Sequence, residues 1–199
     1  MPRMRIIGGK YGSRPLVAPR GRATRPTSDR VREALFGILE SAEVVENARV
    51  IDLYAGTGAL GLESLSRGAV HATFVESARE ALDAIRTNVA TLGVENQAII
   101  VAGDVHKAIR HLSPSAPFDL VLADPPWALV DDGAVMKALR GLLRAQAVGP
   151  RTWIVLEHSA RTTPPAATGD GGLSAFDTRR YGDTALTFYK PDILVRLSP

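Results

Sequence analysis

The sequence predicts an α/β domain with a mostly parallel, doubly wound sheet. From residue 49 onward, short apolar runs typical of buried strands alternate with stretches of helical periodicity. A glycine-rich turn at residues 56–61 joins the first of these strands to a helix. Near the end of the chain, two strand-like runs flank Gly182–Asp183, a hairpin-turn signal, so we expect the last strand to be antiparallel.

A helix is the first element expected after the N-terminal segment. Thr27 or Ser28 can cap its N-terminus, and Asp29 favours the positive end of its dipole. Apolar residues between 31 and 39 then share one helical face. This pattern predicts a helix that begins near residue 28 and covers the edge of the main sheet.

The strands and helices that follow are predicted from apolar runs and periodicity. Five strands are expected at residues 49–56, 72–77, 98–104, 118–123 and 153–159. Helices are expected at residues 58–68, 77–92, 105–112 and 131–147. The stretch 159–175 is rich in Pro, Thr, Gly and Ala and predicts a loop, and residues 176–190 predict the terminal hairpin.

The composition excludes several classes of protein. The chain of 199 residues is 45% hydrophobic, which is typical of a globular domain. It has no cysteine, so disulfides and thiolate metal sites are excluded, and its four histidines lack metal-ligand spacing. The N-terminus lacks the apolar core of a signal peptide, and no apolar run approaches the length of a membrane span. We expect a soluble cytoplasmic protein that needs neither metal nor membrane.

Basic residues are concentrated at the N-terminus. Residues 1–32 carry a charge of +8, whereas the remainder carries −5. A basic arm on an acidic body indicates an anionic polymer as partner. Glycines 8, 9 and 12 with Pro15 indicate turns, so the arm is expected to form a short hairpin. We therefore divide the chain into an arm at residues 1–24 and a catalytic domain at residues 25–199.

The first candidate site is the glycine loop. Asp52 ends the first strand, and Gly56, Gly58 and Gly61 follow with the spacing of a dinucleotide fingerprint. Glu76 ends the second strand, where an acid can hold ribose hydroxyls. On these residues alone, the loop fits NAD and S-adenosylmethionine equally well.

Two further acids follow strands at the same edge of the sheet. Asp104 comes after the third strand, where it can accept a hydrogen bond from an adenine amine or cap the next helix. Asp124-Pro125-Pro126-Trp127 comes directly after the fourth strand. The prolines stiffen the backbone, so the Asp124 carboxylate and main-chain carbonyls can grip an exocyclic base amine while Trp127 stacks on the base. Because NAD enzymes have no use for such a loop, it favours S-adenosylmethionine.

Taken together, these motifs resemble a known family. The segments IIGGKYGSRPL, RPTSDRVREALF, DLYAGTGALGLESLSRGA, DPPW and YGDTALTFY are similar to those of the RsmD family of 16S ribosomal RNA guanine-N2 methyltransferases. The likeness covers nearly the whole chain. It implies a class I, Rossmann-like methyltransferase fold with a seven-stranded sheet, S-adenosylmethionine as methyl donor, and 16S rRNA in the small subunit or its assembly intermediate as partner.

The resemblance also implies roles for individual residues. Base handling falls to Asp124, Pro125, Pro126 and Trp127. Cofactor contacts fall to Asp52, Tyr54, Ala55, Gly56, Thr57, Gly58, Glu76 and Asp104. RNA contacts are expected at Arg3, Arg5, Lys10, Arg14, Arg20, Arg22, Arg25, Arg30 and Arg32.

Other functions compete with this interpretation. A DNA adenine-N6 methyltransferase would use the same loop, although the chain has no visible target-recognition domain. A non-catalytic RNA-binding assembly factor would bind RNA without binding S-adenosylmethionine. A nicotinamide-dependent dehydrogenase would use only the glycine loop.

Overall fold

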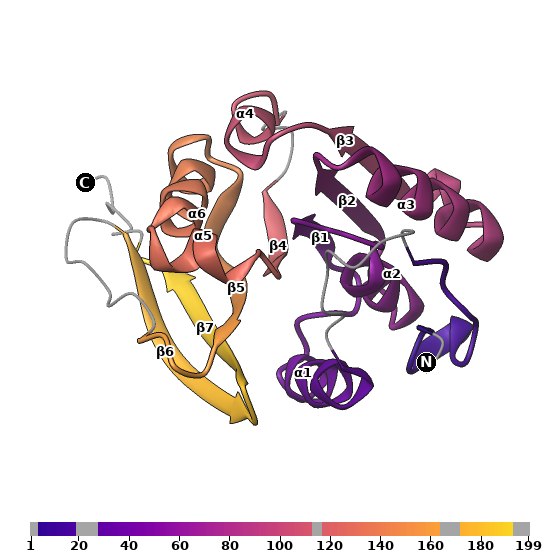
Figure 1. The fold of residues 1–199 in the computed structure, drawn as a ribbon, viewed down its shortest axis with the longest axis horizontal. Coiled ribbons are helices and arrows are strands. Elements are labelled where there is room, and N and C mark those ends of the chain that lie inside the picture. The colour runs from indigo at the N-terminus through magenta and orange to yellow at the C-terminus, as the bar shows by residue number, and fades with distance from the viewer. Residues whose placement is uncertain (1–3, 19–27, 113–116, 164–171, 193–199) are drawn as a thin grey trace, which may run out of the picture.

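The computed structural model describes residues 4–18, 28–112, 117–163 and 172–192, which form one seven-stranded sheet flanked by helices (Figure 1). The strands run in the spatial order β3-β2-β1-β4-β5-β7-β6. Their bounds are β1 (Arg49–Leu53), β2 (His71–Glu76), β3 (Ala98–Ala102), β4 (Phe118–Ala123), β5 (Val148–Ser159), β6 (Leu173–Tyr181) and β7 (Thr184–Pro191). Strands β1 to β5 pair in parallel, and β7 is antiparallel to both β5 and β6. The predicted α/β class, parallel core and terminal hairpin are confirmed.

Helices cover both faces of the sheet. Their bounds are α1 (Asp29–Ser41), α2 (Ala59–Ser66), α3 (Arg79–Leu92), α4 (Val105–Ile109), α5 (Trp127–Asp131) and α6 (Ala134–Arg144), with 3-10 turns η1 (Gly9–Tyr11) and η2 (Glu95–Gln97). One core holds apolar residues of α1, α2 and α3, and a second holds those of α4, α5 and α6. Neighbouring residues of β1 alternate between the two, with Val50 in the first core and Ile51 in the second. The carboxyl ends of β1 to β4 therefore meet at one edge between two helical layers.

The helix predicted at residues 131–147 differs from the observed structure. Only α6 lies within it: α5 ends at Asp131 and α6 begins at Ala134, because Gly133 adopts a φ of +77° and is the N-cap of α6. The Asp132 carboxylate accepts a hydrogen bond from the Ala134 backbone N–H at 2.8 Å, which reinforces that start. Gln146 has a φ of +53°, so the chain has turned out of the helix by that point. The positive φ of Gly133 thus interrupts a segment whose apolar spacing alone predicts one continuous helix.

The N-terminal hairpin packs on the domain. Arg5 and Pro15 form an antiparallel bridge, and the Ile6 backbone N–H donates to the Arg14 carbonyl at 2.9 Å. Ile6 is fully buried, and Tyr11 and Leu16 belong to the same core as α1, α2 and α3. The predicted hairpin is confirmed for residues 4–18, and it shares its core with the sheet.

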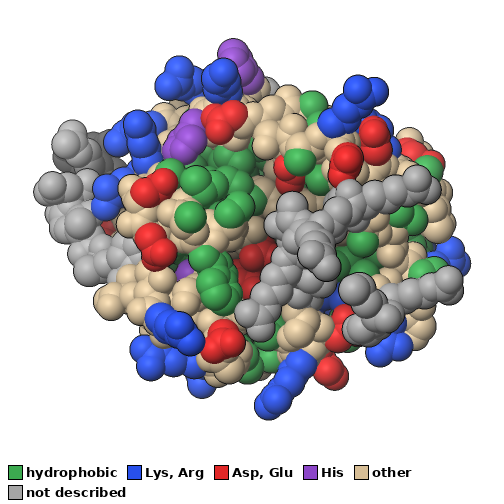
Figure 2. Space-filling model, viewed as in Figure 1, with side chains coloured by type: hydrophobic (Ala, Val, Ile, Leu, Met, Phe, Trp, Pro, Cys, Tyr) green, Lys and Arg blue, Asp and Glu red, His purple; other side chains and the backbone are tan. Residues whose placement is uncertain are grey.

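Charged side chains on the face shown in Figure 2 lie mostly toward its periphery, with hydrophobic side chains exposed nearer the middle. No helix in the described part of the chain combines the length and the apolar character needed to cross a membrane. The described residues also include no group of three His, Asp or Glu side chains that could hold a metal ion.

Candidate functional site

The glycine loop follows β1 and opens α2. Tyr54, Gly56 and Gly58 all have positive φ, at +59°, +55° and +76°. Gly56 and Gly58 have no Cβ, so this conformation costs them little. Tyr54 adopts it as a strained non-glycine residue. Asp52 is 1% exposed and accepts a hydrogen bond from the Gly61 backbone N–H at 2.9 Å. The carboxylate therefore ties the end of β1 to the first turn of α2.

Glu76, at the end of β2, holds the glycine loop through its carboxylate. Its Oε2 accepts from the Gly56 backbone N–H at 2.8 Å, and its Oε1 accepts from Ser77 and Ala78 at 2.8 Å each. The sequence places Glu76 at the end of β2, and β2 lies beside β1 in the sheet. Glu76 is thus held next to the glycine loop, where a ligand seated on that loop would meet it.

Gly61 is required by packing. A Cβ on Gly61 would lie 2.3 Å from Cε1 of Phe74 on β2, whereas real Cβ atoms keep more than 3.0 Å. The missing side chain lets α2 approach the sheet closely, which is the role of the third glycine in the nucleotide-binding fingerprint. The loop is also held from α3, because Asn88 Nδ2 donates to the Thr57 carbonyl at 3.0 Å.

Asn88 was not predicted as part of the site. It is 1% exposed and links Thr57 to the hairpin, since its Oδ1 accepts from the Val17 backbone N–H at 2.7 Å. Asn88 lies between Ile85 and Val89, which sit on the buried face of α3. An amide on an otherwise apolar face is a signal of a buried hydrogen-bonding role, and it could have indicated this contact.

Asp104 begins α4 at the end of β3. Its Oδ1 accepts from the Lys107 backbone N–H at 3.1 Å, so the predicted N-cap role is confirmed. The Gly103 backbone N–H donates to the Glu76 carbonyl at 2.8 Å, which holds the two strand ends together. Burial raises the pKa of Tyr54 to about 12, and the carboxylates of Asp104 and Asp132 add to that rise. These interactions place Asp104 on the same edge as the glycine loop.

Asp124 lies directly after β4, which pairs with β1 on the other side of the glycine loop. Burial raises the pKa of Asp52 well above its usual range, although the hydrogen bond from Gly61 opposes this rise. The negative charges of Asp124 and Glu76 raise that pKa further. The fold therefore brings two predicted acids from neighbouring strands, Asp124 and Glu76, within electrostatic reach of Asp52.

The segment after Asp124 is more helical than a rigid loop. Pro125 is buried, and Pro126 is the N-cap of the short helix α5, which begins at Trp127. The Pro126 carbonyl accepts from the Leu129 backbone N–H at 2.9 Å. That carbonyl was among the main-chain acceptors predicted for a base amine, and here it serves the first turn of α5. Trp127 is half-buried at the start of this helix.

The predicted RNA contacts do not share one environment. Arg3, Arg20, Arg22 and Arg25 lie outside the described residues. Arg5, Lys10, Arg14 and Arg30 are exposed, although Arg5 pairs with Asp29 at 3.3 Å. Arg32 is 1% exposed, and its Nη2 donates to Asp29 at 2.7 Å. Because Arg32 is buried, the expected surface contact with phosphate does not fit its position.

The fold and the loops at its carboxyl edge define a class I methyltransferase domain. A solved structure named "Putative methyltransferase yhhF from Escherichia coli" matches with a TM-score of 0.80 and 32% identity, covering 96% of this chain and 98% of that chain. The family model described as "Conserved hypothetical protein 95" matches residues 4–190. The chain belongs to this family, which is the RsmD family that its motifs indicate.

Curated relatives carry names that describe an activity. "Putative rRNA methyltransferase YlbH" of Bacillus subtilis is 32% identical over 189 residues, covering 94% of this chain and 98% of its own length. "Ribosomal RNA small subunit methyltransferase D" of Escherichia coli K12 is 41% identical over 125 residues, covering 62% of this chain and 60% of its own length. The chain is thus similar from end to end to a protein named as an rRNA methyltransferase.

Proposed function

We propose that the protein methylates the exocyclic N2 amine of a guanine in 16S rRNA, with S-adenosylmethionine as the methyl donor. Asp124 carries this proposal, because it follows β4, the strand that pairs with β1 ahead of the glycine loop, and the half-buried Trp127 comes three residues later. The names of the relatives favour rRNA as the acceptor. In the cell, we expect the cytoplasmic small subunit or its assembly intermediate to be the substrate.

The described residues fit S-adenosylmethionine. Gly56 and Gly58 leave the backbone open to close approach, and Glu76 offers carboxylate oxygens beside them for ribose hydroxyls. Asp104 is exposed at the end of the neighbouring strand, where its carboxylate would accept from the adenine amine. When bound, this cofactor supplies a methyl group on a positively charged sulfur, and the acids around Asp52 favour that charge electrostatically.

The chain's own residues would prepare the acceptor amine. The lone pair of a guanine amine is conjugated into the ring, so the amine is a weak nucleophile. Asp124 would accept a hydrogen bond from one N–H group of that amine and so orient its lone pair, while Trp127 would stack on the base. With the donor supplying the methyl group, Asp124 would take up the surplus proton of the methylated amine and pass it to water. The target base must leave its stack to reach this position.

Asp124→Asn tests this role. We expect methyl transfer to unmodified small subunits to fall about 100-fold or more, because the carboxylate that takes up the amine proton is replaced by a neutral amide. Calorimetry should show S-adenosylmethionine affinity within a few-fold of wild type. Asp119→Asn is the matched control, since Asp119 is an exposed acid on the same strand that binds the Arg49 backbone N–H. An Asp124→Asn protein with full activity would rule out the proposed role.

A second assay separates the acceptors. Unmodified small subunits, naked 16S rRNA and duplex DNA are offered with labelled donor, and the modified nucleoside is identified by mass spectrometry. We expect N2-methylguanine in rRNA. N6-methyladenine in DNA would favour the competing function, and failure to bind the donor would favour a non-catalytic RNA-binding factor.

A further inference from the structure

A basic hollow lies between α4 and α6, on the face of the sheet opposite the N-terminal hairpin. Its volume is about 560 Å³. Four basic side chains line it, and its remaining lining is apolar or glycine. The lining residues are His106, Ile109, Arg110, Lys137, Ala138, Gly141, Arg144 and Ala145. Lys, Arg and His side chains gather where Figure 1 places these two helices, at the upper left of the face in Figure 2.

The cations of this hollow are available to a ligand. Arg110, Lys137 and Arg144 are exposed, and none of them pairs with a carboxylate of the described residues. Arg144 also stands in the last turn of α6, where it favours the helix dipole. Arg110 likewise stands at the C-terminus of α4, as its C-cap, whereas Lys137 lies in the first turn of α6 and has no such role. Several like charges converging on one concavity repel one another, so an anion that neutralises them is favoured.

The position of the hollow points to RNA as the anion. His106 lies two residues beyond Asp104, and α6 follows the Asp124 segment after α5 alone. Lys137 and Arg144 are seven residues apart on α6, or about 10 Å along its axis, which suits an extended polyanion better than one phosphate ion. The exposed cations Lys10 and Arg14 of the hairpin lie with the other helical layer. Basic surfaces thus stand on both sides of the edge that carries Asp124.

We propose that the hollow between α4 and α6 binds the phosphate backbone of the substrate RNA, so that the RNA is held from both sides of the acceptor site. This inference rests on the proposed function and adds a contact surface to it. Phosphate contacts position a nucleic acid without reading its sequence, and each one makes binding depend on salt.

The triple variant Arg110→Ala, Lys137→Ala and Arg144→Ala tests the proposal. Binding of a 16S rRNA fragment and of unmodified small subunits is measured by fluorescence anisotropy across a series of salt concentrations. We expect affinity to fall about ten-fold or more near physiological salt, and the slope of log K against log salt to become shallower by about 2. The control variant Arg86→Ala, Arg151→Ala and Arg179→Ala removes the same charge from exposed positions elsewhere.

A pair of substitutions at Gly141 isolates charge from shape. A Cβ at this position would lie 3.5 Å from Ile109 Cγ2, an ordinary contact, so a longer side chain can extend into the hollow. Gly141→Glu and Gly141→Gln have the same size and differ in charge. We expect the glutamate variant to bind RNA more weakly than the glutamine variant, while both bind S-adenosylmethionine as wild type does.

The outcomes separate this inference from the proposed function. If the wild-type protein neither binds nor methylates RNA, the proposed function itself fails. If the wild type does both and the triple variant keeps the same affinity and salt slope, the hollow is not an RNA contact. A loss seen with whole subunits but not with naked RNA would point to a ribosomal protein and would also overturn the proposal.

Discussion

Asp52 illustrates how burial controls a single side chain in this site. Its carboxylate is almost fully enclosed and keeps one backbone hydrogen bond, from Gly61. Losing water disfavours the charged form, and this is the largest cause of its raised pKa. The glycine loop and strand-end acids were predicted from sequence because they follow apolar runs. The enclosure of Asp52 depends on elements distant in sequence, so its pKa could not be predicted.

This raised pKa has a consequence for stability. Between the unfolded pKa, about 3.9, and the higher folded pKa, the native state binds more protons, so the contribution of Asp52 to stability falls as pH rises. Asp52→Asn removes this titration and retains an acceptor for Gly61. We expect the unfolding free energy of the variant, minus that of wild type, to increase with pH from about pH 4 upward. Urea denaturation at several pH values measures this difference, and a constant difference would contradict it.

Gly61 and Gly37 form a matched pair of helical glycines. Gly61→Ala would drive a Cβ into Phe74, and we expect a loss of about 1–3 kcal/mol in unfolding free energy from overpacking. Nothing lies within 4 Å of a Cβ at Gly37 on α1, so Gly37→Ala should stabilise the protein by up to about 1 kcal/mol. Thermal and chemical denaturation of the two variants should therefore shift in opposite directions; equal shifts would argue against the close approach of α2 to β2.

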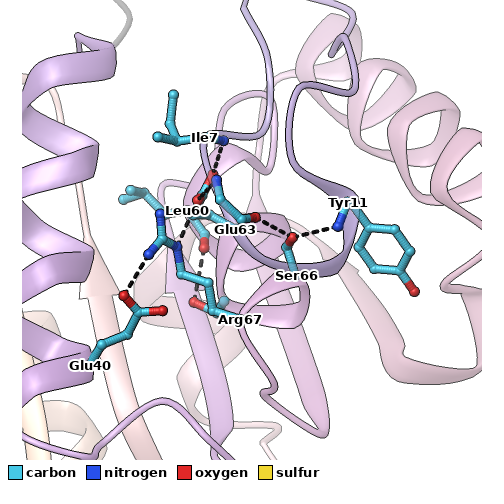
Figure 3. A network of polar contacts seen from close by, with 9 residues as sticks. Ile7, Tyr11, Glu40, Leu60, Glu63, Ser66 and Arg67 are labelled. Carbon is cyan, nitrogen blue, oxygen red and sulfur yellow. Dashed lines mark hydrogen bonds and ion pairs between the residues drawn. The ribbon is translucent and has the colours of Figure 1, made fainter.

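At the scale of elements, one buried acid attaches the N-terminal hairpin. Glu63 on α2 is 0% exposed and accepts from the backbone N–H groups of Ile7 and Gly8 at 2.7 and 2.8 Å (Figure 3). Arg67 donates to the same carboxylate at 2.8 Å and reaches Glu40 on α1 at 2.7 Å. The hairpin, α2 and α1 are thus joined by one network. The sequence indicated a hairpin from its glycines but gave no sign of this anchor.

Glu63→Ala should disrupt that anchor. The change leaves two hairpin N–H groups without their acceptor and leaves the Arg67 guanidinium with Glu40 alone, so we expect a loss of about 3–5 kcal/mol in unfolding free energy. Amide exchange at Ile7 and Gly8 should accelerate more than exchange in β1. Glu40→Ala is the control, because Glu40 pairs with the same Arg67 but is 47% exposed, and it should cost no more than about 1 kcal/mol. Similar losses in both variants would exclude a special role for Glu63.

At the scale of the whole molecule, the hairpin combines an observed role in packing with a proposed role in RNA binding. Ile6, Tyr11 and Leu16 contribute to the core, whereas Lys10 and Arg14 are exposed. Deleting residues 1–18 should lower the melting temperature sharply, because it uncovers apolar surface and removes the partners of Glu63. Such a deletion cannot by itself report on RNA binding.

The double variant Lys10→Ala and Arg14→Ala isolates the second role. We expect its melting temperature to stay within a few degrees of wild type, since exposed substitutions away from the core cost little. Its affinity for small subunits should fall, and the fall should be larger at low salt. Filter binding at two salt concentrations measures this effect, and unchanged affinity would remove the hairpin from the RNA-binding surface.

The sequence by itself determined the alternation of strands and helices, the terminal hairpin and the row of acids at strand ends. These features are local, because apolar period and glycine placement are written within a few adjacent residues. Tertiary structure alone decided that Arg32 is enclosed, that Glu63 anchors the hairpin, and that Arg110 and Lys137 face one hollow. The reason is physical: whether a charged side chain keeps its water, and which charges it meets, depends on the elements that fold over it from elsewhere in the chain.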